Sequence, residues 1–431
     1  MTDLDHDLTD WPRQRPPLAT QLLRKALAPI FRKGTLELRL PDGQSLRIGA
    51  GQPSAGIRIH DWKTVRRLAL NPDLALGESY MDESLTMTRG DIYDLLDLCL
   101  SNIGTGHGNM LRRWRAAGRR LIRPLLMHNP LARARQNVAH HYDLSDALYE
   151  LFLDPERQYS CAYFETPEDD LETAQANKMR RLRMKLRLQP GQRALDIGSG
   201  WGGLGLSLAR EGADVTGVTL SVEQQKYAAA RAAREGLGDS ARFLLRDYRL
   251  LDGQFDRIVS VGMFEHLGLR HFGEYFRKIN DLLAPDGVAL VHTIGNAVGP
   301  GAPHPWIRKY IFPGGYIPAL SEIAPAIEKS GLIVTDIEVL QLHYAETLKA
   351  WRQRFLARRD AAERLYDARF CRMWEFYLAA CEASFRHAGL VVWQIQLTKR
   401  VGVVPMTRAY LSQGGAGREK RAAQPALRAA K

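Results

Sequence analysis

From Gly191 onward, short apolar runs alternate with segments that have the period of an amphipathic helix. Apolar runs of this length, bounded by turn residues, are typical of buried parallel strands. The helical segments fall between the early runs, so the pattern predicts an α/β fold with a doubly wound, Rossmann-like sheet whose last two strands pair as an antiparallel edge. The predicted strands are 194–197, 213–220, 241–247, 255–261, 287–294, 332–342 and 391–399.

The N-terminal part shows a different pattern, in which apolar and polar positions alternate with the period of two of half-buried strands. The alternation reverses at Pro41-Asp42-Gly43, which is typical of a hairpin turn. Residues 17–105 are therefore expected to form a small α+β domain. Its predicted elements are a hairpin of strands 36–40 and 45–48, a strand at 57–59, and helices over 18–31, 62–71 and 91–101.

The remaining segments suggest where the domains begin and end. Residues 1–16 are charged and contain prolines, and residues 413–431 are rich in Gly, Ala and basic residues, so both are predicted to be disordered. Residues 106–136 are interpreted as a linker, and 137–412 as the main catalytic domain. Within that domain, 348–387 is predicted to be a mostly helical insertion rich in Trp, Tyr and Phe.

The charge is unevenly distributed along this 431-residue chain of net charge +12, because no acidic residue lies between Asp97 and Asp143. Arginines alternate there with apolar residues, so 106–136 reads as a basic amphipathic segment that binds an anionic membrane surface, or as a solvated linker. Nucleic acid is disfavoured, since no recognition motif accompanies the charge. No apolar run is long enough to span a bilayer, and residues 1–10 do not form a signal peptide. A cytoplasmic, peripherally membrane-associated protein is expected.

The glycine-rich segment from Arg193 to Gly203 is the strongest chemical signal. A short strand enters a glycine cluster that opens a helix, as in nucleotide-binding turns. The spacing also fits a dinucleotide, but the next strand ends Val218-Thr219-Leu220-Ser221 without the acidic residue that a dinucleotide ribose requires. Asp196, inside the first strand, suits a cationic ligand, and S-adenosylmethionine carries both a sulfonium and an ammonium.

The segment Asp196-Ile197-Gly198-Ser199-Gly200-Trp201-Gly202-Gly203 resembles the first motif of class I S-adenosylmethionine methyltransferases. With further motifs, the chain is similar to the cyclopropane-fatty-acyl-phospholipid synthases and the related mycolic acid cyclopropane synthases. Those motifs are His141-Tyr142-Asp143-Leu144, Tyr159-Ser160-Cys161-Ala162-Tyr163-Phe164, Phe264-Glu265-His266, His292-Thr293-Ile294-Gly295, residues 310–315 and residues 343–348. Gly77-Glu78-Ser79-Tyr80-Met81 resembles the extra N-terminal domain of the phospholipid-acting members.

The resemblance implies transfer of a methylene from S-adenosylmethionine across the cis double bond of an unsaturated phospholipid acyl chain, through a carbocation. It also implies a homodimer, an acyl channel lined by 348–387, and a bound bicarbonate as base, held by Cys161, Glu265, His292, Tyr344 and the backbone of Ile294. The residues expected to bind S-adenosylmethionine are Tyr159, Ser160, Asp196, Gly198, Gly200, Gly202, Thr219, Leu220, Gln224, Asp247 and Tyr248.

Alternatives remain open from the residues themselves. Cys161 fits a buried apolar site, His292 a structural strand end, and 348–387 a plain helical core. At the level of function, a sibling enzyme could make methylene- or methyl-branched lipids or methylate a small amine. A non-catalytic membrane-binding module is a further alternative, which the joint presence of Cys161, Glu265, His292 and Tyr344 disfavours.

Overall fold

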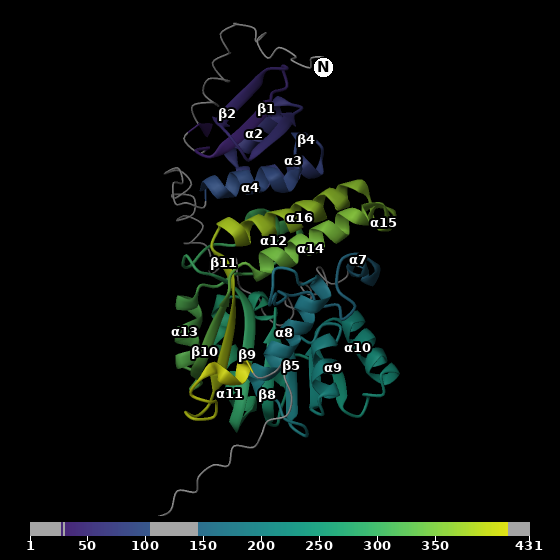
Figure 1. Ribbon diagram of the computed structural model, residues 1–431, viewed down its shortest axis with the longest axis vertical. Helices are drawn as coiled ribbons and strands as arrows, with labels where there is room; N and C mark the ends of the chain where they lie inside the picture. Colours follow the sequence, from purple (N-terminus) through teal and green to yellow (C-terminus); the bar gives the residue numbers. More distant parts are fainter. Residues whose placement is uncertain (1–26, 29–30, 104–144, 413–431) are drawn as a thin grey trace, which may run out of the picture.

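The computed structural model describes residues 27–28, 31–103 and 145–412. The predicted disorder at 1–16 and 413–431, the linker 106–136 and nearly all of the helix over 18–31 lie outside these ranges, as does the motif 141–144. Elements are labelled as in Figure 1.

The N-terminal domain is a four-stranded sheet packed on helices, in the strand order β2-β1-β3-β4. The hairpin is confirmed, since Leu38 pairs with Leu46 in antiparallel strands, whereas β3 runs parallel to β1. α3 and β4 were not predicted, because α3 has no clear apolar period and contains Gly77, and β4 is short. The elements are β1 (Gly34–Arg39), β2 (Ser45–Ala50), β3 (Ser54–Ile59), α2 (Trp62–Leu70), α3 (Pro72–Met81), β4 (Leu85–Arg89) and α4 (Ile92–Ile103).

The second sheet has seven strands in the order β10-β11-β9-β8-β5-β6-β7. The neighbours from β9 to β7 are parallel, and β11 is antiparallel to both β9 and β10. The predicted antiparallel edge is therefore confirmed. The strands are β5 (Arg193–Ile197), β6 (Asp214–Thr219), β7 (Ala241–Leu245), β8 (Phe255–Val261), β9 (Leu283–Asn296), β10 (Ile333–Leu340) and β11 (Leu390–Thr398).

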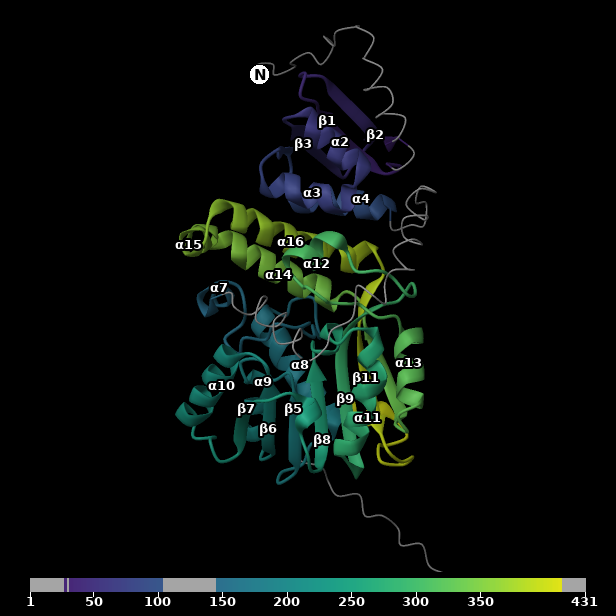
Figure 2. The ribbon, with the colours of Figure 1, turned by 180° about the vertical axis from the view of Figure 1, so that it is seen from behind.

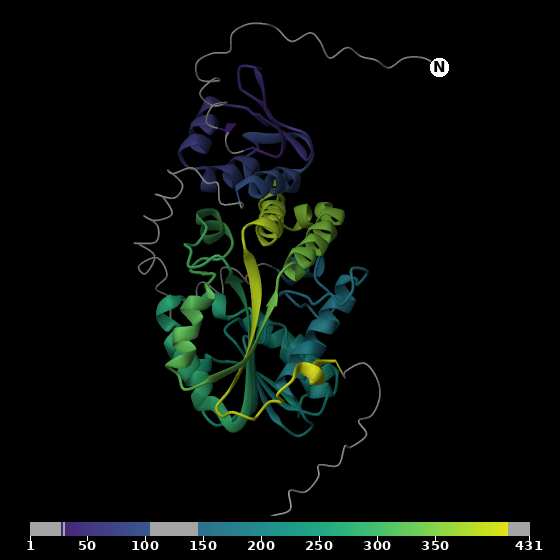
Figure 3. The same cartoon turned by 60° about the vertical axis from the view of Figure 1, so that its left-hand side comes forward.

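Helices cover both faces of this sheet, as Figure 3 shows with the strands between a green and a teal layer. One face packs on α8 (Leu171–Leu186), α9 (Gly203–Arg210) and α10 (Val222–Arg234), and the other on α11 (Phe272–Leu282) and α13 (Leu320–Glu328). The doubly wound α/β prediction is thus confirmed.

The helical insertion lies between the two sheets (Figures 1 and 2). It forms three helices in sequence. The last of them begins where the Asp367 side chain caps the Phe370 N–H. Its large aromatic side chains, such as Trp351 and Trp374, are buried in a core shared with the N-terminal domain. The predicted acyl channel stays a prediction. The helices are α14 (His343–Ala357), α15 (Arg359–Leu365) and α16 (Ala368–His387), with α12 (Pro305–Tyr310) beside them.

Candidate active site

The glycine turn after β5 places its glycines in the left-handed backbone region, with φ of 82° at Gly198, 54° at Gly200 and 84° at Gly202. A Cβ on Gly202 would lie 2.8 Å from Ala228 Cβ, whereas a Cβ on Gly200 would meet no atom within 4 Å. Gly202 is therefore required for packing. Gly200 leaves open space at the start of α9, where the free helical N–H groups favour a polar ligand.

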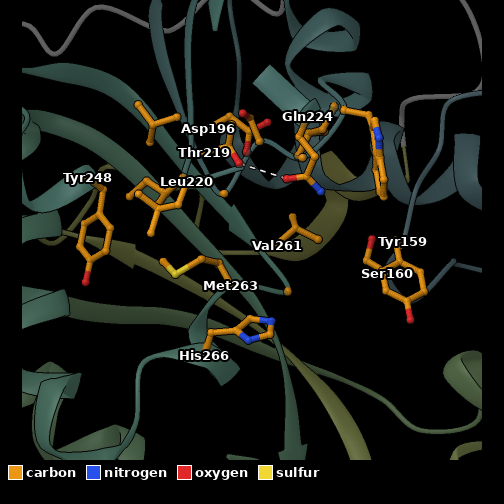
Figure 4. A pocket seen from close by; sticks show the side chains of 18 of the residues that line it. Tyr159, Ser160, Asp196, Thr219, Leu220, Gln224, Tyr248, Val261, Met263 and His266 are labelled. Atoms are coloured by element: carbon orange, nitrogen blue, oxygen red, sulfur yellow. Dashed lines mark hydrogen bonds between the residues drawn. The ribbon is translucent and has the colours of Figure 1, made fainter. Parts of the chain in front are cut away.

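A pocket opens beside this turn, at the carboxyl ends of β5, β6 and β8, where the chain order of the strands reverses. Doubly wound sheets bind ligands at this position. Gly202 does not line the pocket and packs against Ala228 and Phe243 instead. The other residues expected to bind the cofactor do line it (Figure 4): Tyr159, Ser160, Asp196, Gly198, Gly200, Thr219, Leu220, Gln224, Asp247 and Tyr248.

Asp196 supplies a buried carboxyl to the pocket wall. Burial raises its pKa to about 7, and its Oδ2 has no hydrogen-bond partner within the described part of the chain. A buried carboxylate with one oxygen left without a hydrogen bond is costly, and a cationic ligand would offset part of that cost. This geometry supports the expectation of a positively charged cofactor.

The far walls of the pocket are held by local polar pairs. Thr219 Oγ1 donates to Gln224 Oε1 at 3.0 Å, and Figure 4 shows the two side chains next to each other. Asp247 accepts from Arg249 Nε at 2.9 Å and from Arg249 Nη2 at 2.7 Å. These pairs hold the side chains that line this part of the pocket.

Tyr159 connects the pocket to the helical insertion. Its ring stacks on Trp351 of α14 at 5.2 Å between centroids, and its hydroxyl lies 2.7 Å from the Tyr377 hydroxyl of α16. The insertion therefore supports one wall of the pocket as well as forming a core.

Among the expected catalytic groups, Glu265 and Ile294 are in direct contact. The Ile294 N–H donates to Glu265 Oε1 at 2.6 Å, so this N–H, expected to hold bicarbonate, is used by the carboxyl. Glu265 is buried in the short helix Phe264–His266, and burial raises its pKa to about 7. Its Oε2 has no partner among the described residues. The carboxyl can therefore accept or share a proton near neutral pH.

Cys161, His292 and Tyr344 each have their own contacts. The Cys161 thiol donates to the Ala162 carbonyl at 3.2 Å, and the Tyr344 ring packs on Phe385 at 4.8 Å between centroids. Burial raises the pKa of the Cys161 thiol, which stays protonated, and lowers the pKa of His292 to about 3, which keeps its imidazole neutral. His292 Nδ1 lies 3.2 Å from Gln394 Nε2. Next to Cys161, the Ala162 N–H donates to Thr347 of α14, the helix that carries Tyr344.

None of these five catalytic candidates lines the pocket, but Ser160 and His266, which do, adjoin Cys161 and Glu265 in the chain. Cys161 and Glu265 therefore lie next to residues of the pocket wall, in the second layer of side chains around the pocket.

Sequence reasoning missed several lining residues, namely Arg157, Gln158, Trp201, Met263 and His266. Trp201 stands inside the glycine motif, and its Nε1 donates to Asp146 Oδ1 at 3.0 Å, anchoring α7 (Asp146–Glu150) beside the pocket. The sequence carries no comparable signal for Gln158 or Met263.

The family model of mycolic acid cyclopropane synthetase matches residues 130–395. A second model, described as a domain of unknown function, matches residues 22–105, which nearly coincide with the N-terminal domain.

Two curated relatives cover most of the chain. The cyclopropane-fatty-acyl-phospholipid synthase of Escherichia coli strain K12 is 40% identical, over 81% of this chain and 90% of its own. The tuberculostearic acid methyltransferase UfaA1 of Mycobacterium tuberculosis is 36% identical, over 91% and 96%. Among solved structures, mycolic acid cyclopropane synthase CmaA1 complexed with SAH and CTAB aligns with a TM-score of 0.58 and 35% identity, over 63% of this chain and 99% of that one.

Proposed function

The chain belongs to the mycolic acid cyclopropane synthetase family of S-adenosylmethionine-dependent methyltransferases, and from this premise we propose that it is a cyclopropane-fatty-acyl-phospholipid synthase. Its substrate would be the cis double bond of an unsaturated phospholipid acyl chain. The observation that carries the proposal is Glu265, a buried carboxyl with one unpartnered oxygen, which adjoins His266 of the methyl-donor pocket in the chain.

The reaction needs a base as well as a methyl donor. The sulfonium of S-adenosylmethionine supplies an electrophilic methyl group, which the π electrons of the alkene attack. The resulting carbocation closes to a cyclopropane only when a proton leaves the new methyl group. A site for this reaction must therefore exclude water and offer a proton acceptor. Glu265, with a pKa raised to about 7, can take that proton or pass it on.

Bicarbonate is proposed as the immediate base in this site. When bound, it would supply a small oxyanion that accepts the proton. Three side chains have the chemistry to donate to such a guest: the Cys161 thiol, once turned from its bond to the Ala162 carbonyl, the neutral imidazole of His292 and the Tyr344 hydroxyl. Glu265 would share a proton with the anion through its unpartnered Oε2. The Ile294 N–H would act indirectly, by orienting Glu265.

A membrane surface is the proposed location of the substrate, and the outer face of the N-terminal sheet offers matching charge. Arg39 and Arg58 are exposed and lie opposite each other on β1 and β3. Like charges in register repel, and an anionic surface would relieve that repulsion. Arg47 is exposed on the next strand, while the nearby Glu37 is paired with Arg89. No helix in the described ranges is long and apolar enough to cross a membrane.

This surface can be tested apart from catalysis. R39Q/R58Q should weaken co-sedimentation with vesicles that contain anionic phospholipid, more at low salt than at high salt, and leave S-adenosylmethionine affinity unchanged. The matched control is R210Q/R242Q, on the catalytic domain. Equal sedimentation of the two double variants would contradict the assignment.

A second candidate product is a methyl-branched acyl chain. It is favoured by the match to UfaA1 over nearly the whole length of both chains. That product would require the carbocation to lose a proton so that a methylene or alkene group forms instead of a ring, and a separate reductase with its own hydride donor to saturate that double bond.

Fatty-acid analysis separates these outcomes. The protein is expressed in a host that lacks cyclopropane lipids, and its fatty acids are examined by mass spectrometry and proton NMR. A cyclopropane adds one CH2 and gives upfield ring protons without an alkene signal, whereas a methyl branch adds CH4 and gives no ring signal. No mass change in any unsaturated chain would contradict both.

A further inference from the structure

Lys178 lies in the middle of α8 with 0% of its surface exposed, on the stripe that also carries Leu171, Ala174 and Leu182. Burying an ammonium costs several kcal/mol of hydration unless partners replace the water. A methionine would fill similar space without that cost. The buried charge therefore points to a role other than packing.

The Lys178 ammonium holds the chain segment that forms one wall of the cofactor pocket. Its Nζ donates to Gln158 Oε1 at 2.7 Å and to Ser160 Oγ at 2.9 Å. One turn earlier on α8, Gln175 Nε2 donates to the backbone oxygens of Gln158 and Ser160, at 3.2 and 3.0 Å. Because Gln158, Tyr159 and Ser160 all line the pocket, α8 anchors this wall from behind.

The charge of Lys178 also acts on several groups around it. Burial lowers its pKa to about 8, and the acidic groups of Asp154, Cys161 and Asp196 oppose that shift. In return, Lys178 limits the rise in the pKa of Asp196 and helps to keep His292 neutral. These four groups, from the segment after α7, from β5 and from β9, are the titratable groups that its charge acts on most clearly.

We infer that Lys178 is a positioning residue of the methyl-donor site, which fixes the Gln158–Ser160 wall and sets a positive charge beside Asp196. The inference rests on the proposed use of this pocket by S-adenosylmethionine. Lys178 favours the ionised form of Asp196, and the Asp196 carboxylate attracts the cationic cofactor. Without the lysine charge, Asp196 would bind a proton more tightly and lose that attraction near neutral pH.

The test measures S-adenosylmethionine affinity by isothermal titration calorimetry at pH 6.5, 7.5 and 8.5. K178M should weaken binding at least about tenfold at pH 6.5. The difference in affinity between K178M and wild type should become smaller by pH 8.5, because the higher pH favours ionised Asp196 even when the lysine charge is absent. K178R should restore much of the affinity at pH 6.5. K185M is the matched control, because Lys185 is equally buried on α8 but pairs with Glu338; its affinity should stay within about twofold of wild type.

The coupling to Asp196 is tested by adding K178M to D196N, where it should cost less affinity than K178M costs in the wild type at pH 6.5, because only the anchoring of the Gln158–Ser160 wall is then lost. If K178M alone is unfolded, the double variant should still fold, because it removes both charges. Affinity of K178M within twofold of wild type at every pH, the same loss at every pH, or an unfolded double variant would each overturn the inference. A wild-type protein that binds no S-adenosylmethionine would instead contradict the proposed function.

Discussion

The backbone N–H of Ile294 donates to Glu265 Oε1 at 2.6 Å, and so ties this buried carboxyl to the end of β9. The bond leaves Oε2 as the carboxyl oxygen without a partner among the described residues. One oxygen is thus used for orientation and the other is available for a proton. Because the carboxyl is buried, its pKa is raised to about 7, and it can change protonation under physiological conditions.

E265Q should keep cofactor binding and lose turnover. The amide oxygen of glutamine can still accept from Ile294, but the side chain no longer takes a proton, so kcat should fall about 100-fold or more. Activity is measured as release of S-adenosylhomocysteine in the presence of unsaturated phospholipid vesicles, and affinity by calorimetry. The wild-type rate should rise with pH through about 7, as Glu265 ionises. Glu274, a half-buried carboxyl of α11 that pairs with His271, provides the control, E274Q. Turnover of E265Q at the wild-type rate would show that Glu265 takes no part in the proton transfer.

The same substitution should change how stability depends on pH. The pKa of Glu265 is about 7 in the folded protein and about 4.5 when unfolded, so between these values the native state binds more protons than the unfolded state. Wild-type stability therefore falls as pH rises through this window, by on the order of 3 kcal/mol from this one group. E265Q lacks that loss. Urea unfolding at pH 5 and pH 8 should show its stability relative to wild type increasing with pH, and a constant difference would contradict the assignment.

The sheet could be predicted from sequence because each strand is a short apolar run whose ends are marked by turn residues, as at Ile197 and Gly198. The pocket wall was predictable where residues stand at the carboxyl end of a strand, as Thr219 does at the end of β6 and Asp247 does two residues after β7. The contact of Ile294 with Glu265 was not, because it depends on how the short helix Phe264–His266 packs against the end of β9. Nor was Lys178, since a lysine in a helix is ordinarily solvated and only tertiary packing buries it.

Two glycines of the turn should respond differently to a methyl group. G202A combines a φ of 84° with a contact of 2.8 Å to Ala228 Cβ, so it should lower the unfolding free energy by about 2–4 kcal/mol. G200A has open space around its Cβ and should cost about 1–2 kcal/mol. Gly200 lines the pocket, however. G200A should therefore lose more free energy of S-adenosylmethionine binding than free energy of unfolding. Urea unfolding and calorimetry on both variants check this; a larger loss of stability in G200A would contradict the packing argument.

Glu338 of the edge strand β10 should stabilise the fold through α8. It accepts from Arg181 Nε at 2.9 Å and forms an ion pair with the buried Lys185. These cations outweigh burial and lower the pKa of Glu338 to about 2, so its stabilisation is present above its ordinary pKa of 4.5 and is lost as pH falls toward 2. E338Q should therefore lower the unfolding free energy by about 3 kcal/mol at pH 7, because Lys185 loses its charged partner. The difference in unfolding free energy between E338Q and wild type should shrink below pH 4, because the wild-type carboxylate begins to bind a proton and lose its charge there.

The control is E363Q, which breaks a pair between Arg359 and Glu363 within α15 and should cost less than about 1 kcal/mol. An equal cost for both variants at pH 7 would show that the contact between β10 and α8 is no stronger than a surface ion pair.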